Sequence, residues 1–181
     1  TVFGLIFRAV DGDLWVENLL TTLPGGAMGF LIVVNLMVFL LAFFLRLYRI
    51  DWQSLWVDEN YTLFISGKDL ASIAQITSLD VHPPLYYYIV HYWVGLTGQS
   101  EFSLRFMSLF FSLPLVPLTF KLGSLLVGRR AGAIAAFLAA IAPFQIYYAQ
   151  EARMYSLMTL LSLLSTFAMV RVARYGSTVS D

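Results

Sequence analysis

The segment "FLIVVNLMVFLLAFF", residues 30–44, contains no charged side chain and decides the fold class of this chain. A helix needs roughly 20 apolar residues, with a working range of about 17 to 25, to cross the hydrocarbon core of a membrane. The apolar stretch extends over residues 27–45 and follows Pro24-Gly25-Gly26, a turn-forming sequence. We therefore predict a membrane-spanning helix over residues 27–45.

Three further segments have the length and composition of membrane spans, at residues 106–127, 131–149 and 154–170. Basic residues lie between the second and third spans and after the fourth, as Arg129, Arg130, Arg171 and Arg174. The overall composition agrees, because 12% of the residues are charged, against about 25% in soluble domains. We predict an all-α membrane protein, a polytopic helical bundle with about four spans and additional surface helices beside the membrane.

The remaining composition excludes several classes of site. Eleven basic and eleven acidic residues balance, so bulk charge indicates no binding to nucleic acid. Cysteine is absent, which excludes disulfides, thiolate metal sites and a cysteine nucleophile. The chain begins at Thr1 without the residue order of a signal peptide, and we expect it to be a fragment of a longer protein or a small subunit. Residues 1–26 and the tail at 175–181 receive no role.

A shorter apolar stretch, residues 85–96, follows Pro83-Pro84 and is rich in tyrosine and tryptophan. These side chains favour the headgroup layer, where one end of the ring is apolar and the other is wet. We predict an interfacial or re-entrant helix here, and a full crossing is the alternative. If this stretch lies on the membrane surface, three acidic motifs share one side of the membrane, whereas a crossing would separate them. The motifs are Asp58-Glu59, Asp80-Val81-His82 and Gln150-Glu151-Ala152-Arg153.

The outer loop, about residues 46–99, holds two of these motifs, and the third follows residue 149. The positive-inside rule places the face with Arg129, Arg130, Arg171 and Arg174 in the cytoplasm, although Arg46 and Arg49 count against this orientation. We therefore expect a multi-pass protein of the cell membrane with the acidic loops on its extracytoplasmic side.

Two short amphipathic helices are expected in the outer loop, both lying on the membrane surface. Apolar residues recur at helical spacing, as Val57, Tyr61, Phe64 and Ile65 in the first and as Leu70, Ile73, Ala74 and Thr77 in the second.

The charged motifs supply two kinds of chemical group. Asp58, Glu59 and Glu151 are carboxylates, one of which could take a proton from an attacking hydroxyl. His82, Arg105 and Arg153 could bind a leaving phosphate. Each group also has a purely structural interpretation, as a solvated surface acid, a helix-end anchor or a hydrogen-bond donor. The two histidines lack the spacing of a metal site, and although loop carboxylates offer oxygen ligands to a divalent ion, the sequence indicates no metal and no cofactor.

Three stretches carry a family resemblance: "SLWVDENYT", "DVHPPLYYYIVHYWVGLTGQSEFSLRF" and "GRRAGAIAAFLAAIAPFQIYYAQEARMYSL". In amino-acid sequence and in order along the chain, they resemble the N-terminal half of the dolichyl-phosphate-mannose protein mannosyltransferase-like glycosyltransferases. This group includes the lipid A aminoarabinose transferases. The resemblance covers about residues 27–174. It implies the multi-span GT-C fold and inverting transfer of a sugar from a polyprenyl-phosphate carrier to a lipid, glycan or protein acceptor on the outer side of the membrane.

The resemblance also implies roles for individual residues. Asp58 matches the proposed catalytic base, Glu59 its paired acid, and Glu151 the acidic residue after the third span. His82 stands where the aminoarabinose transferases carry a lysine that is proposed to meet the lipid phosphate. A neutral imidazole donates a hydrogen bond without a full charge, so Arg105 and Arg153 are the stronger phosphate candidates.

Two other functions remain open from the sequence. A non-catalytic subunit could retain this fold and pack against partners in a larger membrane complex. A transporter is a weaker alternative, because the acids lie in loops and at helix ends rather than at mid-span. The expected partners of the enzyme are a polyprenyl-phosphate-linked sugar, its acceptor and membrane lipids.

Overall fold

The computed structural model describes residues 9–12, 14–15, 17–18 and 26–175, and these form helices, turns and loops without a β-strand. The predicted all-α fold is therefore confirmed. Most of the predicted N-terminal segment lies outside the described residues, and so does the tail from residue 176. The chain divides into two compact units, residues 1–38 and residues 39–181. The named helices are α3 (Gly26–Leu47), α4 (Val57–Ser66), α5 (Leu70–Ser78), α6 (Leu85–Thr97), α7 (Glu101–Ser112), α8 (Leu115–Leu126), α9 (Arg129–Ile141), α10 (Pro143–Ala149) and α11 (Tyr155–Tyr175).

Within the first unit, the described part of α3 carries apolar side chains that are open to the surroundings. Ile32 and Met37 are 63% and 64% exposed. Such exposure would be costly in water, but it is natural for a helix surrounded by lipid.

Three continuous segments are long and apolar enough to cross a membrane: Met28–Leu47, Glu101–Leu126 and Tyr155–Arg174. A fourth candidate is the pair α9 and α10, which bends by 54°. This agrees with the prediction of about four spans, and the chain is a multi-pass membrane protein.

Proline explains the breaks in two of these segments. Pro114 lies between α7 and α8, and Pro143 is the first residue of α10. Proline has no backbone N–H and its ring clashes with the preceding turn, so a helix bends or ends there. The stretch predicted as one span over residues 131–149 is therefore two helices joined at Ala142.

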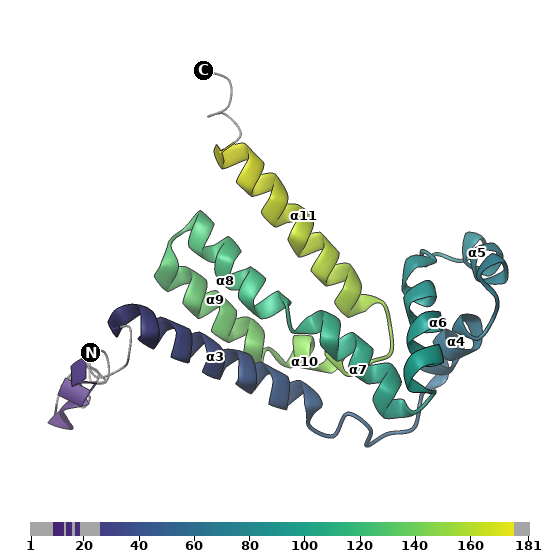
Figure 1. Ribbon diagram of the computed structural model, residues 1–181, viewed down its shortest axis with the longest axis horizontal. Helices are drawn as coiled ribbons and strands as arrows, with labels where there is room; N and C mark the ends of the chain where they lie inside the picture. The colour runs from purple at the N-terminus through teal and green to yellow at the C-terminus, as the bar shows by residue number, and fades with distance from the viewer. Residues whose placement is uncertain (1–8, 13, 16, 19–25, 176–181) are drawn as a thin grey trace. The chain divides into compact units, whose positions relative to one another are not determined.

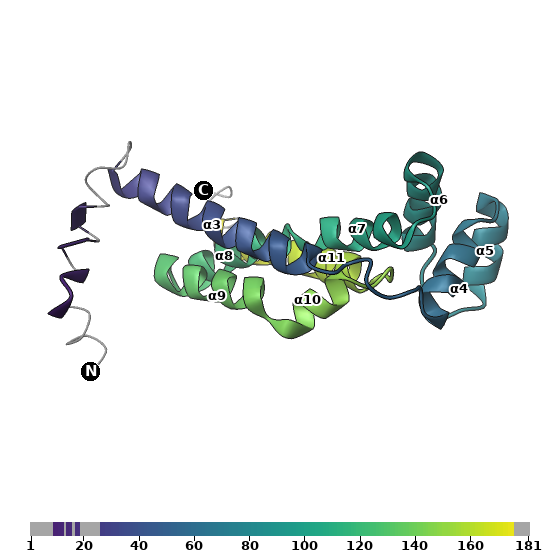
Figure 2. The same ribbon diagram turned by 90° about the horizontal axis from the view of Figure 1, so that it is seen from below.

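Helices α8 and α9 form a tight antiparallel hairpin within the second unit (Figures 1 and 2). Their closest approach is at Gly123 and Gly132, where a Cβ added to Gly132 would lie 2.6 Å from the carbonyl oxygen of Phe120. Small residues allow such close backbone packing between membrane helices. The alanine- and glycine-rich sequence of α9 thus has a packing role.

Helices α4, α5 and α6 form a group beside α7 (Figure 1). Helix α6 has 13 residues, which makes it about 20 Å long, too short for a hydrocarbon core of about 30 Å. Tyr86 and Tyr87 on α6 are buried in two different apolar clusters rather than exposed at an interface. Helix α6 therefore joins the core around α7 to the core between α4 and α5.

Of the four residues expected to form the apolar face of α4, only Ile65 is buried inside the protein. Val57, Tyr61 and Phe64 are exposed, whereas Glu59 and Thr62 are buried together with Ile65. The cause is that Glu59 has charged and polar partners inside the protein, which apolar periodicity alone does not reveal.

Candidate functional site

A buried ion pair joins α4 to α7 and forms the centre of the site. The guanidinium of Arg105 donates from Nε to Oε1 of Glu59 at 2.9 Å and from Nη2 to Oε2 at 2.7 Å. Both side chains are almost inaccessible, at 7% and 1% exposed. Such a bidentate pair fixes direction as well as distance.

Arg105 also holds the chain that leads from α3 to α4. Its Nη1 donates to the carbonyl oxygens of Ile50 and Gln53, and its Nη2 donates to that of Ser54. These three hydrogen bonds and the two to Glu59 employ all five N–H groups of the guanidinium. In this arrangement, among the described residues, Arg105 keeps no N–H free for a phosphate.

Glu59 connects a third segment to this pair. Its Oε1 accepts a hydrogen bond from the backbone N–H of Ala152 at 2.9 Å, and its Oε2 accepts one from the N–H of Trp56 at 3.2 Å. Burial alone would raise the pKa of Glu59, but the hydrogen bonds from Arg105 and Ala152 outweigh it and hold the pKa below its usual range. Glu59 is therefore an ionised anchor between α4, α7 and the loop after α10.

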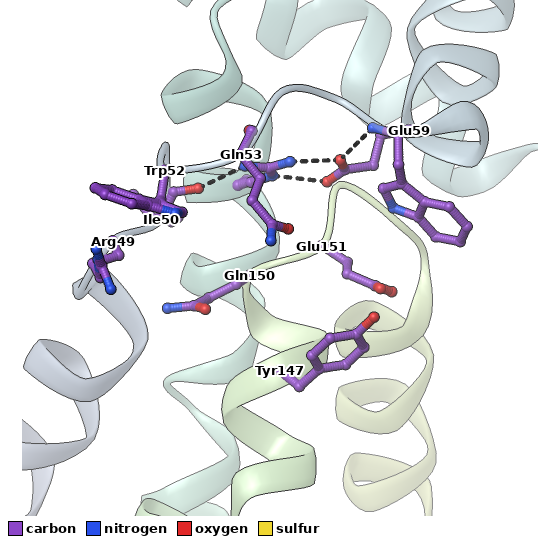
Figure 3. Close-up of a pocket in the computed structure, with 10 residues that line it drawn as sticks. Arg49, Ile50, Trp52, Gln53, Glu59, Tyr147, Gln150 and Glu151 are labelled. Carbon is purple, nitrogen blue, oxygen red and sulfur yellow. Dashed lines mark hydrogen bonds and ion pairs between the residues drawn. The ribbon is translucent and has the colours of Figure 1, made fainter.

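A pocket of about 350 Å³ opens beside this anchor (Figure 3). It is lined by Arg49, Ile50, Trp52, Gln53, Trp56, Glu59, Arg105, Tyr147, Gln150 and Glu151. The guanidinium of Arg49 lies 3.6 Å from the ring centre of Trp52, a cation–π contact. The lining combines aromatic faces with a few directed polar groups, which is typical of small-molecule sites.

Glu151 is the carboxylate of this pocket that is not held by an ion pair, and Tyr147 lies next to it (Figure 3). Burial raises the pKa of Glu151, and the nearby negative charge of Glu59 raises it further, against a hydrogen bond from Tyr147 that lowers it. Glu151 therefore stays protonated to a higher pH than an ordinary glutamate.

Asp58 is not among the residues that line this pocket. Its carboxylate is 42% exposed, and its Oδ2 lies 3.7 Å from Nη2 of Arg153. Arg153 also donates from Nη1 to the carbonyl oxygen of Asp58 at 3.3 Å. The side chain of Arg153 is 5% exposed, so the start of α4 lies directly against the loop before α11.

The segment before the double proline belongs to the same neighbourhood. Nδ1 of His82 lies 3.3 Å from Oδ2 of Asp80. The hydrogen bond with His82 holds the pKa of Asp80 below its usual range, and the charge of Arg153 adds a smaller effect in the same direction. Asp80 and His82 thus contact each other, while Arg153 contacts Asp58 and acts on Asp80 through its charge.

Two side chains that the sequence analysis did not select fix the bent span next to the pocket. Arg46 on α3 donates to the carbonyl oxygens of Ala140 at 2.9 Å and Ala139 at 3.1 Å, at the end of α9. In return, Nε2 of Gln150 donates to the carbonyl oxygens of Arg46 and Tyr48. An arginine at the end of an otherwise apolar span is the sequence signal that could have identified this contact.

The comparisons with known proteins identify the family. Residues 81–180, more than half of the chain, match the family model for dolichyl-phosphate-mannose-protein mannosyltransferase. The chain belongs to this mannosyltransferase family. Among curated proteins and among solved structures, nothing matches the chain.

Membership in the mannosyltransferase family confirms the resemblance and the polytopic GT-C fold class. It also makes the chain a member of a membrane glycosyltransferase family. The match includes His82, Arg105, Glu151 and Arg153 but begins after the acidic pair Asp58-Glu59. The roles of these six residues stay predictions. Among the described residues of this mannosyltransferase family member, no group of three histidines, aspartates or glutamates is close enough to hold a metal ion.

Proposed function

We propose that this chain forms the catalytic end of an inverting glycosyltransferase that moves a sugar from a polyprenyl-phosphate donor to an acceptor on the outer side of the membrane. One observation carries the proposal: Glu59 is hydrogen-bonded to both Arg105 and Ala152. This brings the acidic motif at the start of α4 against the segment that contains Glu151 and Arg153. Three motifs that are distant in sequence therefore meet at one end of the second unit.

In the proposed reaction, Asp58 accepts the proton of an acceptor hydroxyl. The acceptor oxygen forms a bond to the anomeric carbon from the face opposite the phosphate, so the configuration inverts. The bond between that carbon and the phosphate oxygen breaks, and its electron pair leaves with the polyprenyl phosphate. The partial exposure of Asp58 leaves room for an acceptor, while Arg153 holds its backbone and carboxylate in place.

We assign the leaving phosphate to Arg153 and His82. Nε of Arg153 is buried and has no hydrogen-bond partner among the described residues, and His82 contacts Asp80, on which the charge of Arg153 also acts. Arg105 has a different role in this proposal, because its N–H groups are employed in holding Glu59 and residues 50–54. Arg105 and Glu59 are positioning residues that place Asp58 next to Arg153.

The pocket beside Glu59 is the proposed site for a sugar ring. Trp52 and Trp56 offer flat apolar faces, and Tyr147, Gln150 and Glu151 offer hydrogen-bonding groups. The carboxyl group of Glu151 can accept a hydrogen bond from a sugar hydroxyl in either protonation state. The combination of aromatic faces and hydrogen-bonding groups in the lining supports binding of a hydroxyl-rich ligand.

The test is sugar transfer from a synthetic polyprenyl-phosphate mannose by the membrane-inserted protein and its Asp58→Asn variant. Loss of a general base costs about 10² to 10⁴-fold in rate, so we expect transfer to fall at least 100-fold with insertion unchanged. Asp51→Asn is the matched control, since Asp51 is exposed and near the site but outside the pocket lining. Equal turnover in Asp58→Asn and wild type would reject Asp58 as the base, whereas no transfer by the wild type itself would favour a non-catalytic subunit.

A further inference from the structure

A second pocket, of about 340 Å³, lies between α8, α9 and α11. It is near the C-terminal end of the Glu101–Leu126 span, whereas Arg105 is near the N-terminal end of that span. Its lining has a cationic part and an apolar part. The cations are Lys121, Arg129 and Arg171, and the apolar side chains are Phe120, Leu125 and Phe167. Each of the three helices contributes one cation, so the positive charge converges from three directions.

Among the described residues of the second unit, no acidic side chain pairs with these three cations. The sequence contains no aspartate or glutamate in residues 113–149 or in residues 155–175. None of the three cationic side chains forms an ion pair or a hydrogen bond with another described residue. Three like charges around one cavity repel one another, and an anion in the cavity would remove that repulsion.

The backbone adds a further preference for an anion. Helix α9 begins at Arg129, and its N-cap, Gly128, offers no side chain to the first N–H groups. The positive end of the helix dipole and these free N–H groups favour a negative group at this position. Ser124 also lines the pocket, and its buried Oγ has no partner among the described residues.

The position of the pocket indicates what kind of anion it would take. Lys121 and Leu125 are in the last turns of one candidate span, Arg171 is in the last turn of another, and Arg129 begins the bent pair. Span ends lie at the boundary between hydrocarbon and water, where lipid headgroups are found. Basic pockets between membrane helices at this depth bind anionic headgroups.

We propose that this pocket binds an anionic membrane phospholipid. The phosphate lies among Lys121, Arg129 and Arg171, and an acyl chain lies along Phe120, Leu125 and Phe167. A free phosphate would use the cations but leave the three apolar side chains without a partner. The site is separate from the proposed sugar-transfer site, which lies at the opposite end of the same span.

The chain offers a closely matched pair of variants for the test. Arg129→Gln with Arg171→Gln removes two cations of the pocket. Arg130→Gln with Arg174→Gln removes two cations from the same helices and the same end, but neither residue lines the pocket. The probe is fluorescent phosphatidylglycerol titrated onto the purified protein in neutral detergent, with fluorescent phosphatidylcholine as the uncharged-lipid control. Thermal melts of both variants check that they remain folded.

We expect the pocket variant to weaken phosphatidylglycerol binding about 30-fold, at about 1 kcal/mol for each cation near an anionic lipid. The control variant is expected to change it less than about threefold, and phosphatidylcholine is expected to bind weakly to all three proteins. Equal losses in the two variants would show a general surface charge and overturn the proposal. Displacement of the lipid by millimolar inorganic phosphate would also overturn it, because a phosphate ion alone would then occupy the site.

Discussion

At the scale of single residues, the Glu59–Arg105 pair separates two adjacent acids that look alike in the sequence. Glu59 is 1% exposed and accepts four hydrogen bonds, whereas Asp58 is 42% exposed. Breaking a buried pair by removing one charge leaves the other charge uncompensated, which costs about 3 to 5 kcal/mol. We therefore expect Glu59→Gln to destabilise the protein by about that amount, measured by thermal or denaturant unfolding in detergent. Asp51→Asn, which changes an exposed acid, is expected to change stability by less than about 0.5 kcal/mol.

The same pair predicts a pH dependence. The pKa of Glu59 is lowered in the folded protein from an ordinary value of 4.5. Its contribution to stability is therefore complete above pH 4.5 and is lost as the pH falls through the lower, folded value. We expect the stability difference between wild type and Glu59→Gln to be constant from pH 6 to pH 8 and to shrink below about pH 4.5. A difference that grows on acidification would contradict this assignment.

At the scale of helices, the sequence predicted the existence and type of the elements well, because apolar periodicity and length are local properties. It did not predict the 54° bend within the span at residues 131–149, although Pro143 was visible. It also did not predict that Glu59 on α4 is buried. The partners of Glu59 are Arg105 and Ala152, which are distant in sequence, and no local pattern reveals a hydrogen bond of that kind.

The α8–α9 hairpin gives a prediction at the same scale. A Cβ at Gly132 would meet backbone atoms of Phe120 and Ser124, which cannot move without separating the helices. We expect Gly132→Ala to destabilise the protein by about 1 to 3 kcal/mol through overpacking, measured as a lower Tm. Gly95→Ala on α6 is the control, because its Cβ would meet no atom within 4 Å. That control is expected to be neutral or to stabilise, because alanine favours a helix by about 1 kcal/mol over glycine.

At the scale of the whole molecule, the arrangement of the site depends on contacts that bring distant segments of the second unit together. The sequence placed Asp58, His82 and Glu151 on one side of the membrane only by assuming that residues 85–96 do not cross it. The length of α6 supports that assumption, and the contacts of Arg153 with Asp58 bring two of the motifs together. Arg46 and Gln150 then fix the bent α9–α10 pair, so that Tyr147 and Glu151 lie at the pocket.

The absence of cysteine from the chain makes the membrane topology directly testable. Single cysteines at Leu79 and Leu96, which are 90% and 84% exposed, lie before α6 and in its last turn, and Val127, 79% exposed, lies between α8 and α9. If α6 lies on the outer surface, a membrane-impermeant maleimide added to intact cells labels Leu79→Cys and Leu96→Cys equally. Val127→Cys then reacts only after the membrane is permeabilised, because a full span separates it from α6. A crossing by α6 would instead give opposite labelling of the Leu79 and Leu96 variants, and the acidic motifs could not share one outer site.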